Sequence, residues 1–162
     1  MNTCLRLPVV RFALLIIAMG TLANAQAEPV YISPSTKIIL DRSGKPQEGE
    51  ASYYGENFYG RKMADGTPMD PDANIAASRT LPLGSIVEVT NVENGKSEVV
   101  EIRDRGPYIE GRIIDLSPKV AEDLDMLEQG VVEVVVTPLE VPQADGTVAT
   151  GSGGTQEASA AK

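Results

Sequence analysis

Residues 86–102 read IVEVTNVENGKSEVVEI, and this stretch decides the fold class. Two runs rich in β-branched residues, 86–92 and 97–102, stand on either side of Asn94 and Gly95. Both turn residues tolerate a positive φ, which a tight turn between antiparallel strands requires. The stretch therefore predicts a β-hairpin.

Two more strands and one helix are expected further along the chain. The apolar run at residues 131–137 (VVEVVVT) is almost continuous, so we expect a strand that is buried on both faces. Residues 113–116 predict a shorter strand. Ser117 is a good N-cap and Pro118 suits the first helical position, so a helix is expected to continue over residues 119–124. The fold class is therefore mainly β, and a small barrel is favoured because closure removes exposed strand edges.

The N-terminal segment has the pattern of an export signal. Arginines lead into the apolar run at residues 12–19 (FALLIIAM), and Ala23 and Ala25 form a small-x-small cleavage motif. A membrane-spanning helix needs roughly 20 apolar residues, which this run does not reach. We expect residues 1–25 to be a signal peptide that is cleaved near Ala25, with cleavage after Ala27 as the alternative. The mature protein is expected to be periplasmic or secreted, with no stable membrane anchor.

The remainder of the chain divides into three parts. Residues 26–47 contain several prolines and a strand-like piece at residues 36–40, which predicts an arm or linker. The barrel domain is expected at residues 48–140. Residues 141–162 contain hardly any large side chains, and such a stretch cannot bury enough apolar surface to offset its ordering entropy. We therefore expect a disordered tail there.

Composition and charge exclude several classes of function. The 162 residues include no histidine, so no mechanism can use an imidazole as base or metal ligand. The single cysteine, Cys4, lies in the predicted signal peptide, which leaves the mature protein without thiolate chemistry. The formal net charge of -9 disfavours a nucleic-acid partner, whose phosphates would be repelled. We expect neither a metal nor an organic cofactor.

Four aromatic residues cluster between residues 51 and 61. Tyr53, Tyr54, Phe58 and Tyr59 share this segment with glycine and asparagine, which suggests a surface groove. Flat rings with a polar edge suit the faces and hydroxyls of sugars. The alternative is that these aromatic side chains fill the core.

Asp104 is the leading candidate for acid–base chemistry. Alternate side chains of an extended segment point to opposite faces, so Asp104 is expected to face away from Arg103 and Arg105. In a sheltered pocket, such a carboxyl can donate a proton. The alternative is a turn residue or an arginine partner. Asp115, which stands between aliphatic residues just before the helix, is interpreted as structural, capping or bonding backbone amides.

Four motifs follow one another in the chain: ASYYGENFYGRKMADGTPMD (51–70), IAASRTLPLGSIVEVTNVENGK (75–96), IRDRGPY (102–108) and GRIIDLSPKVAEDL (111–124). Together they resemble the rare lipoprotein A (RlpA) family, over roughly residues 49–136. The resemblance implies a six-stranded double-psi β-barrel with one or two short helices. It also implies a periplasmic lytic transglycosylase, which cleaves peptidoglycan glycan strands between N-acetylmuramic acid and N-acetylglucosamine without water and favours strands stripped of stem peptides.

The resemblance also implies a set of site residues. The family's catalytic aspartate falls on Asp104, whereas the glutamate and the histidine expected of the family fall on Thr67 and Ser78. Glycosidic cleavage needs one group to protonate the leaving oxygen and usually a second group to stabilise charge or remove a proton. Asp104 is therefore expected to act first as acid and then as base, with Thr67 and Ser78 as hydroxyl donors to the substrate. The other expected substrate contacts are Tyr53, Tyr54, Tyr59, Arg61, Arg105 and Tyr108.

Two functions remain open on the sequence. One is an RlpA-type transglycosylase weakened by the loss of the usual glutamate and histidine. The other is a catalytically silent module that binds glycan or serves as a septal scaffold. In either case the expected partners are glycan strands and, as a further candidate, a septal protein, and the expected state is a monomer.

Overall fold

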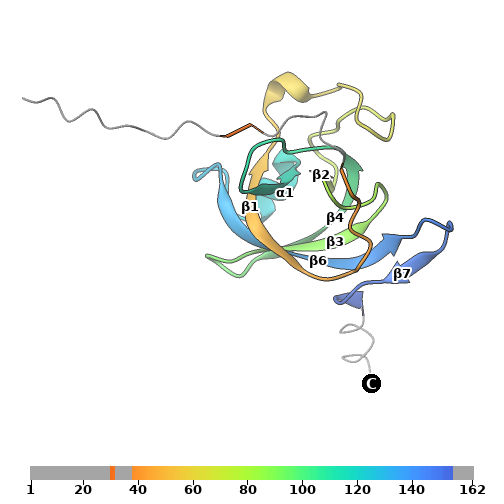
Figure 1. The fold of residues 1–162 in the computed structure, drawn as a ribbon. Coiled ribbons are helices and arrows are strands. Elements are labelled where there is room, and N and C mark those ends of the chain that lie inside the picture. The colour runs from red at the N-terminus through yellow and green to blue at the C-terminus, as the bar shows by residue number, and fades with distance from the viewer. Residues whose placement is uncertain (1–29, 32–37, 155–162) are drawn as a thin grey trace, which may run out of the picture.

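The computed structural model describes residues 30–31 and 38–154 (Figure 1). The predicted signal peptide, residues 1–25, lies outside the described residues, as do residues 155–162 of the predicted tail. No helix within the described ranges is long and apolar enough to cross a membrane.

Six strands close into a barrel, and a seventh is added at its side. Around the barrel the order is β1, β5, β2, β4, β3 and β6, and β1 also pairs with β6. The pairs β1–β5 and β2–β4 are parallel, and the other pairs are antiparallel. The prediction of a mainly β, six-stranded double-psi β-barrel is confirmed. The strands are β1 (Gln47–Tyr53), β2 (Ile75–Ser78), β3 (Ile86–Asn91), β4 (Ser97–Asp104), β5 (Arg112–Leu116), β6 (Val132–Pro142) and β7 (Val148–Thr150).

Two short helical segments accompany the strands, the 3₁₀ helix η1 (Glu56–Phe58) and α1 (Pro118–Asp123). The start of α1 follows the prediction, because the Ser117 hydroxyl accepts a hydrogen bond from the Val120 N–H and Pro118 occupies the first helical position. The predicted hairpin is also present, since β3 and β4 pair antiparallel and Gly95 in their turn has φ 72°.

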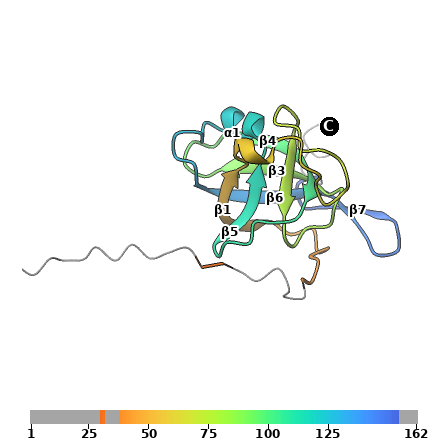
Figure 2. The ribbon, with the colours of Figure 1, turned by 90° about the horizontal axis from the view of Figure 1, so that it is seen from above.

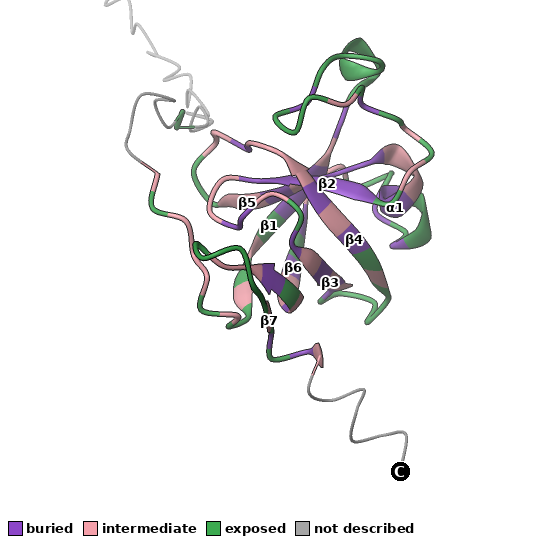
Figure 3. Ribbon diagram, turned by 90° about the vertical axis from the view of Figure 1, so that its right-hand side faces the viewer, coloured by how far each residue is buried: buried purple, intermediate pink, exposed green. Residues whose placement is uncertain are grey.

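The barrel interior is filled by aliphatic side chains that alternate with less buried ones along each strand. Figure 3 shows this alternation along β4. Residues on α1 and just after it pack against the same core. The core includes Val87, Val89, Val100, Ile102, Ile114, Leu116, Val120, Leu124, Val134 and Val136.

The expectation that residues 131–137 are buried on both faces is wrong. In β6, Val132, Val134 and Val136 are buried, whereas Glu133 is exposed and Val135 is only partly buried. The strand belongs to a small closed barrel, in which one face fills the interior and the other faces outward. A run of valines therefore does not distinguish a strand covered on both faces from a barrel strand.

The expectation that the fold ends at residue 140 is also wrong. The strand β6 continues to Pro142, and β7 pairs back on it antiparallel and extends away from the barrel (Figure 2). Gly151 then lies so close to β6 that a Cβ atom would come within 2.1 Å of the Pro138 carbonyl oxygen. A strand is held by its backbone hydrogen bonds. Small residues therefore permit this pairing although they contribute little to a hydrophobic core.

The predicted arm lies partly within the described residues. Residues 38–40 form no strand, and residues 36–37 of the expected strand-like piece lie outside the described ranges. The arm contacts the barrel where the Asp41 N–H donates to the Thr80 carbonyl oxygen and the Gln47 side chain donates to Asp41. Regular structure begins with β1 at Gln47.

Candidate active site

A pocket of about 400 Å³ opens where β1 and β4 end and beside β5. Four of its side chains are acidic or basic, and all four lie between residues 104 and 115: Asp104, Arg105, Arg112 and Asp115. Aromatic side chains form part of its wall, namely Tyr31, Tyr53, Tyr54, Phe58 and Tyr108.

The strand register puts the two aspartates on the same outer face of the barrel. Ala77 of β2 pairs with Asp104 of β4 on one side and with Asp115 of β5 on the other. Neighbouring strands lie about 4.8 Å apart, so the two aspartate Cα atoms are separated by roughly 10 Å. The alanine between them is buried in a small cluster that includes Tyr54.

A β-bulge turns Asp104 outward. Ala76 pairs with Ile102, but Ala77 pairs with Asp104, so β4 contains one extra residue, Arg103, at this point. In a regular strand Asp104 would share a face with Ile102, which is fully buried in the core. The extra residue reverses this direction, as bulges near functional sites commonly do.

The carboxylate of Asp104 is surrounded by hydrogen-bond donors. One oxygen, Oδ1, accepts the backbone N–H groups of Ala64 and Arg105, both at 2.8 Å. The other, Oδ2, accepts the Tyr54 hydroxyl at 2.9 Å. Among the described residues, no lysine or arginine forms an ion pair with Asp104 within 4.0 Å. Because an ionised carboxylate only accepts hydrogen bonds, this arrangement suits Asp104 as a proton acceptor.

The surroundings of Asp115 differ from those of Asp104. Burial raises the pKa of Asp115 above the ordinary value of an aspartate, and the nearby charge of Asp104 raises it further. The Ser52 hydroxyl, which donates to Asp115, and the Arg112 guanidinium oppose this increase. Asp115 is therefore suited to hold and donate a proton. Among the described residues, the hydrogen-bond partner of the Asp115 side chain is the Ser52 hydroxyl and not a backbone amide, which differs from the expected capping role.

Tyr54 connects the two aspartates electrostatically. Its side chain is only 8% exposed, and burial together with the charge of Asp104 raises the pKa of its hydroxyl. The hydroxyl therefore keeps its proton and remains a donor to Asp104. Tyr54 thus positions Asp104, and it also lines the pocket in which the sugar contact is expected.

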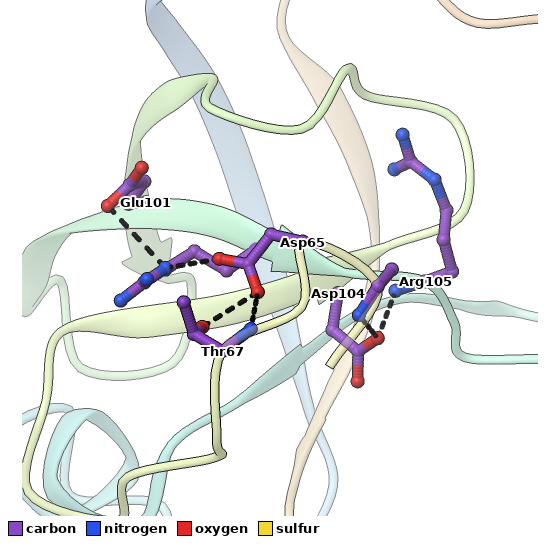
Figure 4. A network of polar contacts seen from close by, with 7 residues as sticks. Asp65, Thr67, Glu101, Asp104 and Arg105 are labelled. Atoms are coloured by element: carbon purple, nitrogen blue, oxygen red, sulfur yellow. Dashed lines mark hydrogen bonds and ion pairs between the residues drawn. The ribbon is translucent and has the colours of Figure 1, made fainter. Parts of the chain in front are cut away.

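Thr67 and Arg103 belong to a separate network beside the pocket (Figure 4). The Thr67 hydroxyl donates to Asp65 at 2.7 Å, and Arg103 forms an ion pair with the same aspartate at 2.7 Å. These hydrogen bonds with Thr67 and Arg103 outweigh desolvation and lower the pKa of Asp65. Thr67 does not line the pocket, so its expected role as a hydroxyl donor to substrate does not fit this structure.

Ser78 is fully buried, and its hydroxyl accepts the Leu81 N–H at 3.2 Å. It is therefore inaccessible to a sugar, contrary to the expectation. Arg105 lines the pocket, but its guanidinium donates to the carbonyl oxygens of Ser78 and Leu81 at 3.0 and 2.7 Å. This arginine holds the chain beside the pocket and leaves Asp104 unpaired by its side chain.

The structure gathers only part of the expected site. Tyr53, Tyr54, Asp104, Arg105 and Tyr108 line one pocket. Tyr59 and Arg61 are exposed outside it, with the Arg61 guanidinium 5.5 Å from the centre of the Phe58 ring. Sequence reasoning did not assign Tyr31, Ser52, Arg112 or Asp115 to the site, and it named Phe58 only as a member of the aromatic cluster.

A local signal for Asp115 was present in the sequence. Ile114 and Leu116 on either side of it point into the core, and strand alternation then directs Asp115 outward. Within the described ranges, no three histidine, cysteine, aspartate or glutamate side chains gather in a way that would hold a metal ion.

The raised pKa of Asp115 predicts a pH-dependent effect of Asp115→Asn on stability. Because the folded-state pKa lies above the unfolded value of about 3.9, the stability contributed by Asp115 is complete below pH ~3.9 and is lost as pH rises through the folded-state pKa. Asparagine does not titrate. We expect Asp115→Asn to gain free energy of unfolding relative to the wild type as the pH rises from 4 toward neutrality, as measured by urea denaturation.

The matched control is Asp72→Asn, which removes an exposed carboxyl group from a loop. If both variants change stability with pH in the same way, the environment of Asp115 does not have the effect described here.

Comparisons with known proteins identify the family of the chain. The family model described as lytic transglycolase matches residues 46–136, more than half of the chain. A protein of Treponema pallidum named "Probable endolytic peptidoglycan transglycosylase RlpA" is 53% identical over 89 residues, which cover 55% of this chain and 28% of that protein. The endolytic peptidoglycan transglycosylase RlpA of Helicobacter pylori strain J99 is 44% identical, over 61% of this chain and 31% of its own length.

The corresponding RlpA protein of Neisseria meningitidis strain MC58 is 45% identical over 140 residues, which cover 76% of this chain and 59% of that protein. The match thus spans about a third of the Treponema and Helicobacter relatives and more than half of the Neisseria one. The resemblance to the RlpA family is confirmed, and the chain belongs to the lytic transglycolase family of double-psi β-barrel proteins.

Proposed function

We propose that this protein is a lytic transglycosylase that cleaves peptidoglycan glycan strands between N-acetylmuramic acid and N-acetylglucosamine. The observation that carries this proposal is the pair of carboxyl groups in one pocket. Asp104 is surrounded by donors, and the pKa of Asp115 is raised by burial. A carboxyl group whose pKa is raised by burial, beside a second carboxyl group that accepts hydrogen bonds, suits the acid and base of such a reaction.

In the proposed reaction, the carboxyl group of Asp115 donates its proton to the glycosidic oxygen as the bond from C1 to that oxygen breaks. The positive charge that develops at C1 is stabilised by the carboxylate of Asp104. The C6 hydroxyl of the same muramic acid then bonds to C1, and its proton passes to Asp104. One fragment leaves with a free hydroxyl and the other with a 1,6-anhydro ring, so no water is consumed. Proton exchange with solvent restores the two side chains.

This assignment differs from a mechanism with Asp104 alone. A single aspartate would have to be protonated at the start of the reaction, whereas the donors around Asp104 suit an acceptor. Asp115 supplies the acid, and neither Thr67 nor Ser78 is needed in a chemical role. The absence of the usual glutamate and histidine is then compatible with turnover.

Mass spectrometry of the products tests the proposal. The wild-type protein, incubated with glycan strands freed of stem peptides, is expected to release fragments whose masses sum to that of the substrate and whose ends are anhydro sugars. Fragments that have gained water would indicate a hydrolase. Glycan that is bound but never cleaved would support the alternative, a glycan-binding module without turnover.

The proposed substrate also implies a location. Peptidoglycan lies outside the cytoplasmic membrane, so a transglycosylase acting on it must be exported, in agreement with the expected signal peptide at residues 1–25. We further propose that the protein acts as a monomer, because one chain contributes both carboxyl groups and the aromatic wall of the pocket.

A further inference from the structure

The pocket has one wall residue from outside the barrel. Tyr31 lies ahead of residues 46–136, which the family model matches, and yet it lines the same pocket as Asp104 and Asp115. Figure 2 shows the short described segment 30–31 beside the loop that leads into β5.

Main-chain contacts hold this segment in place. Tyr31 forms an antiparallel bridge with Ile109, and the Glu110 N–H donates to the Val30 carbonyl oxygen at 2.9 Å. Both contacts use the backbone, so the position of the segment does not depend on the Tyr31 ring. The ring itself is 74% exposed.

The two tyrosines at the end of β1 and just after it are less available. Tyr54 is nearly buried and donates to Asp104, and the Tyr53 hydroxyl donates to the Leu127 carbonyl oxygen at 3.2 Å. Tyr31 is therefore the tyrosine in this wall whose ring is mainly in contact with solvent. A flat aromatic face exposed at the edge of a pocket that also holds carboxyl groups suits the apolar C–H face of a pyranose ring.

We propose that Tyr31 is a substrate-binding residue that stacks on a sugar ring of the glycan strand, next to the bond that is cleaved. This inference rests on the proposed function, and it extends the binding site from the barrel to the N-terminal arm. The ligand class is a chain of N-acetylhexosamine rings. Because stacking uses the ring and not the hydroxyl group, phenylalanine should replace tyrosine.

The test compares three variants of the full exported chain by calorimetric binding to purified glycan strands freed of stem peptides. Tyr31→Ala is expected to weaken binding roughly tenfold and Tyr31→Phe to bind like the wild type, since one aromatic contact is lost only in the first. Val30→Ala is the matched control. Val30 is 60% exposed and its carbonyl oxygen keeps the contact with Glu110, but its side chain does not line the pocket.

Steady-state kinetics on the same strands give a second readout. Tyr31→Ala is expected to raise KM about as much as Kd while kcat stays close to that of the wild type. Equal binding by Tyr31→Ala and wild type would overturn the inference, and so would an equal loss in Val30→Ala. Tighter binding by Tyr31→Ala would also overturn it, because the ring would then obstruct the pocket.

The wild type separates this inference from the proposed function. If the wild type binds and cleaves glycan while Tyr31→Ala behaves identically, only the inference about Tyr31 fails. If the wild type binds without cleaving and Tyr31→Ala weakens that binding, the stacking role stands and the transglycosylase activity fails. If the wild type does not bind glycan, both fail.

Discussion

Asp115→Asn is expected to lower kcat on glycan strands by about 10²- to 10⁴-fold, the usual effect of removing a general acid. Asparagine keeps the size of the side chain and can still accept the Ser52 hydroxyl, but it has no carboxyl proton to give to the leaving oxygen. The measurement is the rate of release of anhydro-ended fragments, followed by mass spectrometry. Binding of the strands should change little, because the loss affects the transition state.

The leaving group distinguishes an acid from a merely structural residue. In a muramic acid glycoside with a 4-nitrophenyl leaving group, the nitrophenolate departs without being protonated. Asp115→Asn should therefore cleave this substrate at close to the wild-type rate while remaining slow on glycan strands. An equal loss on both substrates would contradict the role of Asp115 as the acid. Asp123→Asn, at the surface end of α1, is the control and should retain the wild-type rate on both.

Asp104→Asn is expected to lower kcat by a similar factor, about 10²- to 10⁴-fold, but for a different reason. The variant loses the negative charge that stabilises the developing cation and the group that takes the C6 hydroxyl proton. Its amide would also place an N–H₂ group either where Ala64 and Arg105 now donate hydrogen bonds or where Tyr54 does. The measurement is again the rate of fragment release from glycan strands.

The 4-nitrophenyl glycoside should not restore the rate of Asp104→Asn, since both functions of this carboxylate are needed whatever the leaving group. Rescue equal to that of Asp115→Asn would mean that the two roles are assigned the wrong way round. The double variant should be no slower than about the slower single variant, because residues that act as a unit in one step are not additive.

Local patterns were sufficient for the parts of the fold that depend on neighbouring residues. The β3–β4 hairpin follows from Asn94 and Gly95 between two β-branched runs, and the start of α1 follows from Ser117 and Pro118. In contrast, β1 (QEGEASY) begins with polar residues and a glycine, and β2 has only four residues. The sequence of β1 therefore lacks the apolar–polar alternation that identifies a strand. The sequence of β2 lacks it because this strand is buried along its whole length.

The sequence likewise predicted only part of the candidate site. Asp104 was identified from its motif, and Tyr53, Tyr54, Arg105 and Tyr108 lie with it in the pocket. Thr67 and Ser78 were expected there because of their positions in the family motifs, which give no side-chain direction. In the structure the Thr67 hydroxyl donates to Asp65, and the Ser78 hydroxyl accepts the Leu81 N–H.

The sequence by itself determined a mainly β fold, a β-hairpin, a capped helix and Asp104 as a candidate site residue, all from residues close together in the chain. Only the tertiary structure decided that Asp115 is the second carboxyl group of the site. The pairing of Ala77 with both Asp104 and Asp115 joins three strands that are far apart in sequence, and the bulge at Arg103 turns Asp104 to the outer face. Long-range strand pairing sets both the distance between these groups and the burial that raises the pKa of Asp115. No local pattern contains that information, since it arises only when the barrel closes.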